Sequence, residues 1–196
     1  MRLVMELKSD ALPGCGEGLA GIIDTDINYD QWGLPYIPSK RVKGILREAA
    51  EELADAAQLS GEKTLAHSPA EIFGEPGRER GTTFKIADGR LENHGLLQRL
   101  LRYGRDDSDG AGIFSKEAVL DQFSYFRSQT AINALGVARE NSLRTSRVLK
   151  KGMTFYFDLE IPDNCRDDLE TICRVTRRFG INRTRGLGEI GYKSRG

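Results

Sequence analysis

The sequence predicts an α+β domain in which strands and helices follow the ferredoxin-like order. Two segments alternate apolar and polar residues with the period of a strand, and two others repeat apolar residues with the period of a helix. Along the chain they run strand, long helix, insertions, strand, helix, strand, which is the plan of ferredoxin-like and RRM-like domains. The 196 residues are enough for one such domain with a hydrophobic core of its own.

The first half of the chain predicts one strand and one long helix. Residues 2–8 alternate apolar and polar side chains, as a half-buried strand does. The prolines of segment 33–38 disfavour a helix, and Ser39 after them is a natural N-cap. Apolar residues then recur at helical spacing as far as Ala57, so we expect a helix over about 39–58.

The middle of the chain is expected to hold insertions at about 58–115. Residues 68–71 read Ser-Pro-Ala-Glu, the signature of a capping box with proline in the first turn. A strand is expected at 82–87 and a short helix at 96–101, and the composition of 104–112 is typical of a mobile loop. Residues 128–149 predict an extended or hairpin insertion.

The last quarter predicts a strand, a helix and a glycine-rich loop. Residues 153–161 alternate strongly, and the phenylalanines of this strand are expected in the core rather than as a platform for bases. A helix is expected over 167–179, with Gly180 as the left-handed residue after its end. RRM-type sheets commonly bind RNA on their open face, although fold analogy alone carries little functional weight.

Charge is balanced overall but uneven along the chain. The totals are 29 basic and 29 acidic residues, which argues weakly against a nucleic-acid binder. Residues 1–126 hold 15 basic and 21 acidic residues, a net charge of −6, and residues 127–196 hold 14 and 8, a net charge of +6. Three cysteines without a CxxC pair fit a reducing cytoplasm. We expect a cytoplasmic protein with no membrane partner, because no apolar run reaches membrane length and the start lacks a signal peptide.

Two basic clusters are candidate phosphate sites. The loop at 183–193 combines glycines, which let backbone N–H groups approach a phosphate, with arginines that bind two oxygens at once. Lys40, Arg41 and Lys43 begin the long helix, where cations oppose the helix dipole and an anionic partner would explain them. The alternatives are a tight turn with solvated arginines and an ordinary solvated helix start.

The aspartates that follow the glycine-rich segment 14–21 are the candidate catalytic groups. Asp24 and Asp26 are two residues apart, and carboxylates at that spacing can share a divalent metal or activate a hydroxyl. The alternative for these residues and Asp30 is Asx-turn chemistry in a loop. His67 and His94 have no zinc-site spacing and are expected in loops or in the core.

Three segments together resemble the RAMP superfamily of CRISPR-associated proteins, specifically subunits of type III effector complexes. The first runs from Gly16 through Asp24, Asp30 and the Gly-Leu-Pro-Tyr-Ile-Pro segment to Arg47. The second joins residues 131–138 to Arg147 and the strand at 153–157, and the third is the loop 183–191. Their order and spacing cover most of the chain except about 58–115.

The resemblance implies a modified RRM fold, residues 1–196, with a projecting thumb hairpin at about 126–150. Such subunits polymerise on guide RNA, and the thumb wedges into the guide–target duplex. It also implies that Asp24 cleaves target RNA with Mg²⁺ or another divalent cation. Asp26 is a departure that adds a second ligand, substitutes for Asp24 or plays no part. The implied RNA-binding residues are Lys40, Arg41, Lys43, Arg47, Arg139, Arg144, Arg147, Arg183, Arg185, Gly186, Gly188 and Lys193.

The leading hypothesis is therefore an RNA-binding subunit that contacts guide RNA, target RNA and other effector-complex subunits, and that acts as a metal-dependent endoribonuclease. One alternative is a non-catalytic subunit that caps the guide 5′ end. Another is a guide-processing endoribonuclease, although such enzymes usually use a histidine base and neither histidine lies in a matching motif. An unrelated metabolic enzyme is the remaining alternative.

Overall fold

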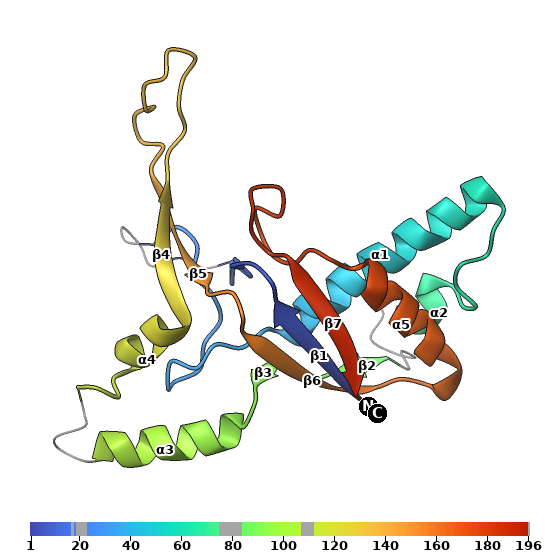
Figure 1. Cartoon of the computed structure of the whole chain (residues 1–196), viewed down its shortest axis with the longest axis horizontal. Coiled ribbons are helices and arrows are strands. Elements are labelled where there is room, and N and C mark those ends of the chain that lie inside the picture. The colour runs from blue at the N-terminus through green and yellow to red at the C-terminus, as the bar shows by residue number, and fades with distance from the viewer. Residues whose placement is uncertain (17, 19–22, 75–83, 107–111, 196) are drawn as a thin grey trace.

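The computed structural model describes the chain except residues 17, 19–22, 75–83, 107–111 and 196. Its centre is an antiparallel sheet in the order β2-β6-β1-β7, in which β3 also pairs with β6 (Figure 1). The strands are β1 (Arg2–Leu7), β2 (Lys85–Ile86), β3 (Arg90–Leu91), β6 (Thr154–Glu160) and β7 (Ile190–Arg195). The two outer connections, from β1 to β2 and from β6 to β7, each pass over one intervening strand, so the expected ferredoxin-like order is confirmed.

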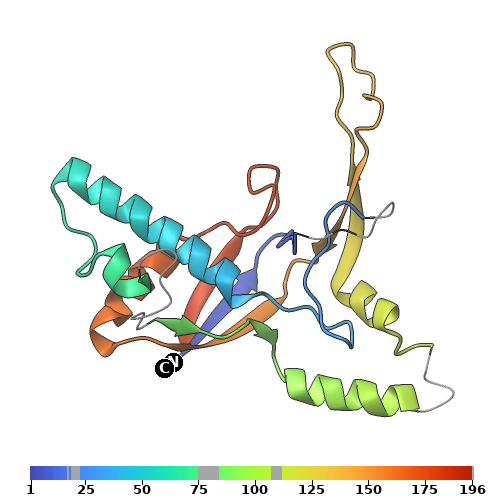
Figure 2. The same ribbon diagram turned by 180° about the vertical axis from the view of Figure 1, so that it is seen from behind.

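Two helices and the sheet enclose the core. Helix α1 (Ser39–Ser60) packs against α5 (Arg166–Val175), and Figure 2 shows α1 crossing in front of the sheet. The strands send their apolar side chains to these helices, and Phe155 and Phe157 of β6 are fully buried, as expected for core residues. Burying such side chains stabilises the fold by about 1.5–3 kcal/mol each.

The ends of α1 and α5 differ from the prediction. Pro38, not Ser39, is the N-cap of α1, and it makes no side-chain cap. The Ser39 N–H instead donates a hydrogen bond to the Asp88 carboxylate at 2.8 Å. Asp88 lies in a distant loop, so the sequence pattern could not reveal this contact. Helix α5 ends at Val175, so Gly180 is not its C′ residue. Gly180 has a φ of 87° because the chain turns there directly against the Leu12 carbonyl.

The insertion between α1 and β6 is more helical than expected. Helix α2 (Pro69–Phe73) has the predicted capping box, and α3 (His94–Asp106) is much longer than the short helix expected at 96–101. Helix α4 (Lys116–Phe123) was not predicted, because its apolar periodicity is weak. Of the strand expected at 82–87, the described residues contain only β2, because residues 82–83 lie outside them. Residues 107–111 of the loop expected at 104–112 also lie outside the described residues.

A second, two-stranded sheet forms the hairpin expected near 126–150. Strands β4 (Ser124–Gln129) and β5 (Arg144–Leu149) pair from Ser124 opposite Leu149 to Gln129 opposite Arg144. Figure 1 shows this hairpin, in yellow and orange, projecting far beyond the central sheet. A short 3-10 turn, η1 (Asp163–Cys165), precedes α5. Within the described residues, no helix is long and apolar enough to cross a membrane.

Candidate nucleic-acid interface

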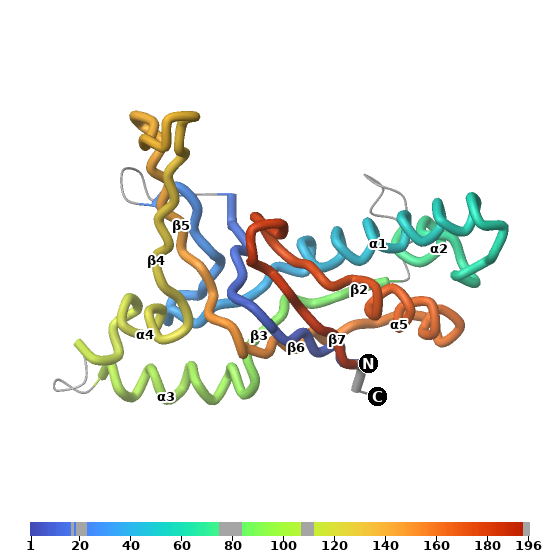
Figure 3. The backbone as a smooth tube through the Cα atoms, turned by 45° about the horizontal axis from the view of Figure 1, so that its top comes forward, coloured from blue at the N-terminus to red at the C-terminus, as the bar shows by residue number. Residues whose placement is uncertain are grey.

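Two projections rise from the same side of the sheet. One is the β4–β5 hairpin, which we call the thumb, and the other is the loop at residues 180–189 between α5 and β7, which we call the terminal loop (Figure 1). The segment that carries Asp24 runs alongside β5, as Figure 3 shows, and Thr25 forms a parallel bridge with Ser146. The structure therefore brings the aspartate segment beside β5, near the outer end of the β4–β5 ladder.

Asp24 is held against the thumb by reciprocal hydrogen bonds with Thr145 of β5. The Asp24 N–H donates to the Thr145 carbonyl at 2.8 Å, and the Thr145 N–H donates to Asp24 Oδ2 at 2.7 Å. Asp24 Oδ1 lies 3.6 Å from a guanidinium nitrogen of Arg144, and the side chain stays 41% exposed. Asp24 is thus a fixed but solvent-accessible carboxylate with a cation beside it.

Gly18 allows this arrangement through close backbone contact. A Cβ built on Gly18 would lie 2.3 Å from the Ile23 carbonyl oxygen and 2.8 Å from that of Asp24. No other residue type fits at that distance without displacing the aspartate segment. Gly18 is therefore needed for close approach of the backbone to another part of the same chain.

Asp26 has the opposite environment. Its side chain is buried, and Oδ1 accepts hydrogen bonds from Arg147 Nε at 3.1 Å and from the Ile27 N–H at 2.8 Å. Tyr29 donates to Oδ2 at 3.3 Å, and burial together with the Asp26 carboxylate raises the pKa of Tyr29. Both oxygens are therefore engaged by protein donors, and Asp26 is not presented to a substrate.

Asp30 organises the loop around it. Its Oδ1 accepts from the Trp32 and Leu34 N–H groups, which is the predicted Asx-turn chemistry. Its Oδ2 accepts from Gln98 at 2.9 Å and lies 3.2 Å from His94 Nε2, so α3 is tied to this loop. Burial lowers the pKa of His94, Arg90 lowers it further, and Asp30 partly opposes the shift.

The predicted pair of metal ligands is not assembled in the described residues. They contain no group of three or more histidine, cysteine, aspartate or glutamate side chains that could hold a metal ion. Asp26 is occupied by Arg147, so Asp24 is the one carboxylate of the predicted pair that a divalent cation could reach. A Mg²⁺ ion often takes only one or two protein carboxylates and completes its shell with phosphate and water. Asp24 fits that role only with RNA phosphate present, and the metal stays a prediction.

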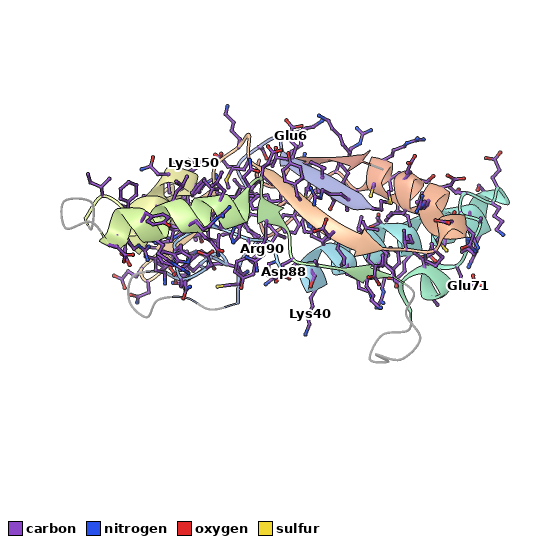
Figure 4. All side chains as sticks on the ribbon, turned by 90° about the horizontal axis from the view of Figure 1, so that it is seen from below. Glu6, Lys40, Glu71, Asp88, Arg90 and Lys150 are labelled. Atoms are coloured by element: carbon purple, nitrogen blue, oxygen red, sulfur yellow. The ribbon has the colours of Figure 1, made fainter. Side chains whose placement is uncertain are left out.

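The start of α1 presents only part of its predicted cluster. Lys40 and Arg41 are exposed, and Figure 4 shows Lys40 extending away from the fold near Asp88. Lys43 is half-buried over the Phe84 ring, and burial lowers its pKa. Arg47 donates to the carbonyls of Phe73 and Gly74 at the end of α2, so it caps a helix instead of facing solvent.

The terminal loop is built as a projecting turn. Gly186 and Gly188 have φ values of 78° and 75°, and a Cβ on Gly188 would meet the Phe179 carbonyl. Arg183 and Arg185 are exposed, and Arg183 reaches Glu48 of α1 at 3.3 Å. A groove of about 700 Å³ lies between this loop and α1, lined by charged side chains from both.

The remaining predicted RNA contacts are scattered. Arg139 is exposed near the thumb tip and Arg144 at the tip end of the β4–β5 ladder, but Arg147 is buried between Asp26 and Asp121. Lys193 lies in β7 and pairs with Glu6 at 3.6 Å, so the structure does not bring it into the terminal loop. On the same open face Arg2 pairs with Asp158 and Lys85 with Glu160. This face is largely neutralised by its own ion pairs, which makes it a weaker candidate for RNA than the side with the projections.

The sequence analysis missed the apolar tip of the thumb. Ile132, Leu135, Val137 and Leu143 are 59–87% exposed there. Asn133 shapes the tip by accepting the N–H groups of Leu135 and Val137, and Gly136 takes a positive φ. The signal was the Asn-Ala-Leu-Gly turn inside a segment whose apolar residues follow neither a strand nor a helix period. Exposed apolar side chains at the end of a hairpin are suited to insertion between stacked bases.

Comparisons with known proteins agree with this architecture. The profile of the RAMP superfamily matches residues 5–195. A chain of the cryo-EM structure of the type III-B Cmr-beta bound to cognate target RNA is similar, with a TM-score of 0.67, 11% identity, and 98% of this chain and 95% of that chain covered. A chain of the apo Cmr-beta structure gives a TM-score of 0.64 at 12% identity, with the same coverage of 98% and 95%. No curated protein matches the sequence.

Proposed function

The chain belongs to the RAMP superfamily, and on that premise we propose that it is an RNA-binding subunit of a type III CRISPR effector complex that cleaves target RNA at Asp24. The observation that carries the proposal is the accessible Asp24 carboxylate fixed against β5 of a projecting hairpin with an apolar tip. The fold shared with Cmr-beta, which has been observed bound to cognate target RNA, supports the same assignment.

The two projections suit the binding of a guide–target duplex. Arg183 and Arg185 in the terminal loop and Lys40 and Arg41 at the start of α1 are exposed cations that would contact backbone phosphates. The thumb tip would separate neighbouring nucleotides, since splaying one nucleotide out of an A-form duplex exposes its sugar and phosphate. Base pairing selects the target, so the protein needs only shape and phosphate contacts.

The proposed cleavage is an in-line attack within the splayed nucleotide. The ribose 2′-oxygen forms a bond to the adjacent phosphorus as the bond to the 5′-oxygen breaks, and the departing 5′-oxygen takes a proton from water, which leaves a cyclic phosphate and a 5′-hydroxyl. Asp24 would accept the proton of the 2′-hydroxyl, and Arg144 beside it would stabilise negative charge on the phosphate. A divalent cation at Asp24 would supply further neutralisation of that charge. Holding the nucleophile in line accounts for much of the expected rate.

The test is the Asp24→Ala variant in the assembled effector complex. Cutting of target RNA opposite this subunit should fall by at least about 100-fold, the lower range for general-base catalysis. The matched control is Asp163→Ala, which removes an exposed carboxylate whose only recorded ion pair among the described residues is to Arg166 on the surface. Unchanged cutting by Asp24→Ala would defeat the catalytic assignment.

The alternative is a structural subunit that caps the guide 5′ end. It is favoured by the predicted phosphate contacts of Arg183, Arg185 and Lys40, which do not depend on Asp24. Under this alternative a complex that contains the Asp24→Ala variant would cut target RNA as the wild-type complex does. The double variant Arg183→Ala with Arg185→Ala would still bind guide RNA more weakly. The two readouts, cutting and guide affinity, separate the candidates.

A further inference from the structure

A pocket of about 180 Å³ opens between α5 and the central sheet. Its lining includes Leu3 of β1, Leu169 and Cys173 of α5, and Tyr192 of β7. Figure 1 shows the chain ends together at one end of β1 and β7, and the terminal loop at the other end of these strands. None of the described residues that line the pocket is a predicted RNA contact. The pocket is therefore a site apart from the candidate nucleic-acid interface.

Two sequence periods bring the walls of this pocket together. Leu169 and Cys173 are four residues apart, so they lie on one face of α5. Tyr192 pairs with Met5 across β1 and β7, and Leu3 is two residues from Met5, so Leu3 and Tyr192 lie on the same face of the sheet. Leu3 and Leu169 are each 1% exposed. The inner part of the pocket is therefore apolar on both the helix side and the sheet side.

The hydroxyl of Tyr192 is the polar group of this pocket that lacks a partner. It is buried, and within the described part of the chain no atom forms a hydrogen bond with it. Buried tyrosine hydroxyls normally have a partner. Burial raises the pKa of Tyr192 well above its ordinary value, and Cys173 adds to the shift, so the hydroxyl keeps its proton. A thiol accepts hydrogen bonds only weakly, so Tyr192 remains a donor without an acceptor.

The outer part of the pocket is polar but balanced in charge. Glu170 and Arg174 also line it, and their side chains pair with each other at 3.6 Å across one turn of α5. These side chains are 44% and 77% exposed, so they face solvent while the leucines lie inside. Burial raises the pKa of Cys173 to about 12, so its thiol is uncharged. No excess of either charge is present to attract an ion, and an uncharged ligand fits best.

The volume of the pocket suits a single aromatic ring, since an apolar cavity of about 150 Å³ is large enough to bind benzene. Sites for small molecules are typically apolar with a few placed polar groups. We propose that this pocket binds an uncharged monocyclic heteroaromatic compound, whose ring packs on Leu3 and Leu169 and whose acceptor atom receives a hydrogen bond from Tyr192. RNA takes no part in this contact, so the site goes beyond the proposed function and does not depend on it.

The test is a titration of the purified full chain with pyridine, followed by NMR of its leucine methyl groups. In mildly alkaline buffer pyridine is an uncharged ring with one acceptor, and benzene is the matched probe without an acceptor. The methyl resonances of Leu3 and Leu169 should shift with saturation at a dissociation constant of about 1 mM or tighter. Those of Leu135 at the thumb tip should not move. If no resonance shifts, or all shift without saturation, only water occupies the pocket and the proposal is overturned.

Tyr192→Phe is the decisive variant, because it removes the hydroxyl and keeps the ring. Its affinity for pyridine should be lower than that of the wild type by about fivefold, the factor expected for one neutral hydrogen bond. Its affinity for benzene should be unchanged, which shows that the variant is folded and that the pocket is intact. Equal affinity of the two proteins for pyridine would overturn the assignment of Tyr192 as the donor.

A second variant, Cys173→Leu, places a larger side chain in the pocket and should abolish saturable binding of both probes. Its matched control is Val175→Leu, which enlarges a 46% exposed side chain of α5 outside the lining and should bind pyridine as the wild type does. Pyridine binding by Cys173→Leu at wild-type affinity would place the ring elsewhere and overturn the proposal. Guide-RNA affinity should be the same in all four proteins. If pyridine binds the pocket but no protein binds guide RNA, the pocket assignment stands and the proposed function fails.

Discussion

Asp24 and Asp26 are two residues apart, yet Asp24 is exposed beside Arg144 and Asp26 is buried against Arg147. Residues i and i+2 of an extended segment normally point to the same side of the chain. The difference in exposure between Asp24 and Asp26 arises from the segments that cover each side chain. Sequence reasoning could identify both carboxylates as candidates because of their spacing. It could not separate them, because the partner of Asp26 lies 121 positions away along the chain.

Removal of Arg147 is expected to damage the fold before it affects RNA binding. Arg147→Ala would leave the Asp26 carboxylate buried without its cation, which costs about 3–5 kcal/mol. Asp24→Ala removes an exposed group and should change the free energy of unfolding by less than about 1 kcal/mol. Urea unfolding followed by circular dichroism measures both, and equal midpoints for Arg147→Ala and wild type would contradict this prediction.

His94 should make the protein less stable in mild acid. Its side chain is 10% exposed, and burial lowers the pKa of His94 in the folded protein below the ordinary value of about 6.5. Between these two pKa values the unfolded chain binds a proton that the folded chain does not, so stability is lost as the pH falls below about 6.5. The groups that face His94 are Arg90, which reinforces the shift, and Asp30, which opposes it.

The measurement is the free energy of unfolding against pH for wild type and His94→Gln. The variant should lose the part of the pH dependence that lies just below about 6.5, whatever its stability at neutral pH. Identical slopes for the two proteins in that range would show that His94 does not titrate differently in the folded chain.

The glycines of the terminal loop should differ sharply when replaced. Gly188→Ala would drive a methyl group into the Phe179 carbonyl, so the loop must rearrange. Gly186→Ala meets no atom within 4 Å and costs only the strain of its positive φ, about 1–2 kcal/mol. We expect Gly188→Ala to lower both thermal stability and guide-RNA affinity, and Gly186→Ala to affect both much less. Similar losses in the two variants would indicate that the loop is not held by that backbone contact.

At the scale of elements, the thumb is an addition to the fold rather than a support for it. β4 and β5 form their own two-stranded sheet, while the tip residues are exposed. The sequence predicted this extended or hairpin insertion because residues 128–149 are polar and only weakly periodic. It did not predict α4 or the full length of α3, because these helices are stabilised by tertiary contacts such as that of Arg105 over the Trp32 ring at 4.6 Å.

Shortening the thumb should therefore abolish cutting without unfolding the protein. Replacing residues 131–142 with an Asn-Gly turn keeps the register of β4 and β5, in which Gln129 faces Arg144, and removes Ile132, Leu135 and Val137 of the apolar tip. The free energy of unfolding should change by about 1 kcal/mol or less, while target cleavage in the complex is lost. A shortened variant that still cleaves would show that the tip is not needed to splay the target.

At the scale of the whole molecule, the sequence was enough to predict the order of the strands and helices. It was not enough to predict how the candidate site is assembled. Alternation in 2–8 and 153–161 and the periodicity of α1 were enough for the ferredoxin-like plan, since core burial imposes those periods. The loops that hold Asp24, Asp88 and the terminal glycines are positioned by contacts between distant segments. Local patterns cannot encode such contacts, so Arg47 and Arg147 were assigned to RNA although the fold uses them internally.

Salt dependence should report how many cations contact RNA. For single-stranded RNA the slope of log affinity against log salt is about −0.7 per phosphate neutralised. Arg183→Ala with Arg185→Ala should make the slope shallower by about 1.4, because both side chains are exposed on the terminal loop. Fluorescence anisotropy over a salt series measures it, with the exposed Arg166 in α5 replaced by alanine as the matched control. A slope equal to that of the wild type would exclude the terminal loop from the RNA surface.

The reciprocal bonds between Asp24 and Thr145 have a mechanical consequence. Because Asp24 is hydrogen-bonded to Thr145 of the thumb, it cannot move independently of the thumb. Any tilt of the thumb therefore moves Asp24 with it. A duplex that binds the thumb tip in the wrong orientation would move the Asp24 carboxylate away from the bond to be cleaved. Under the proposed function, mispaired targets would then be bound but left uncut.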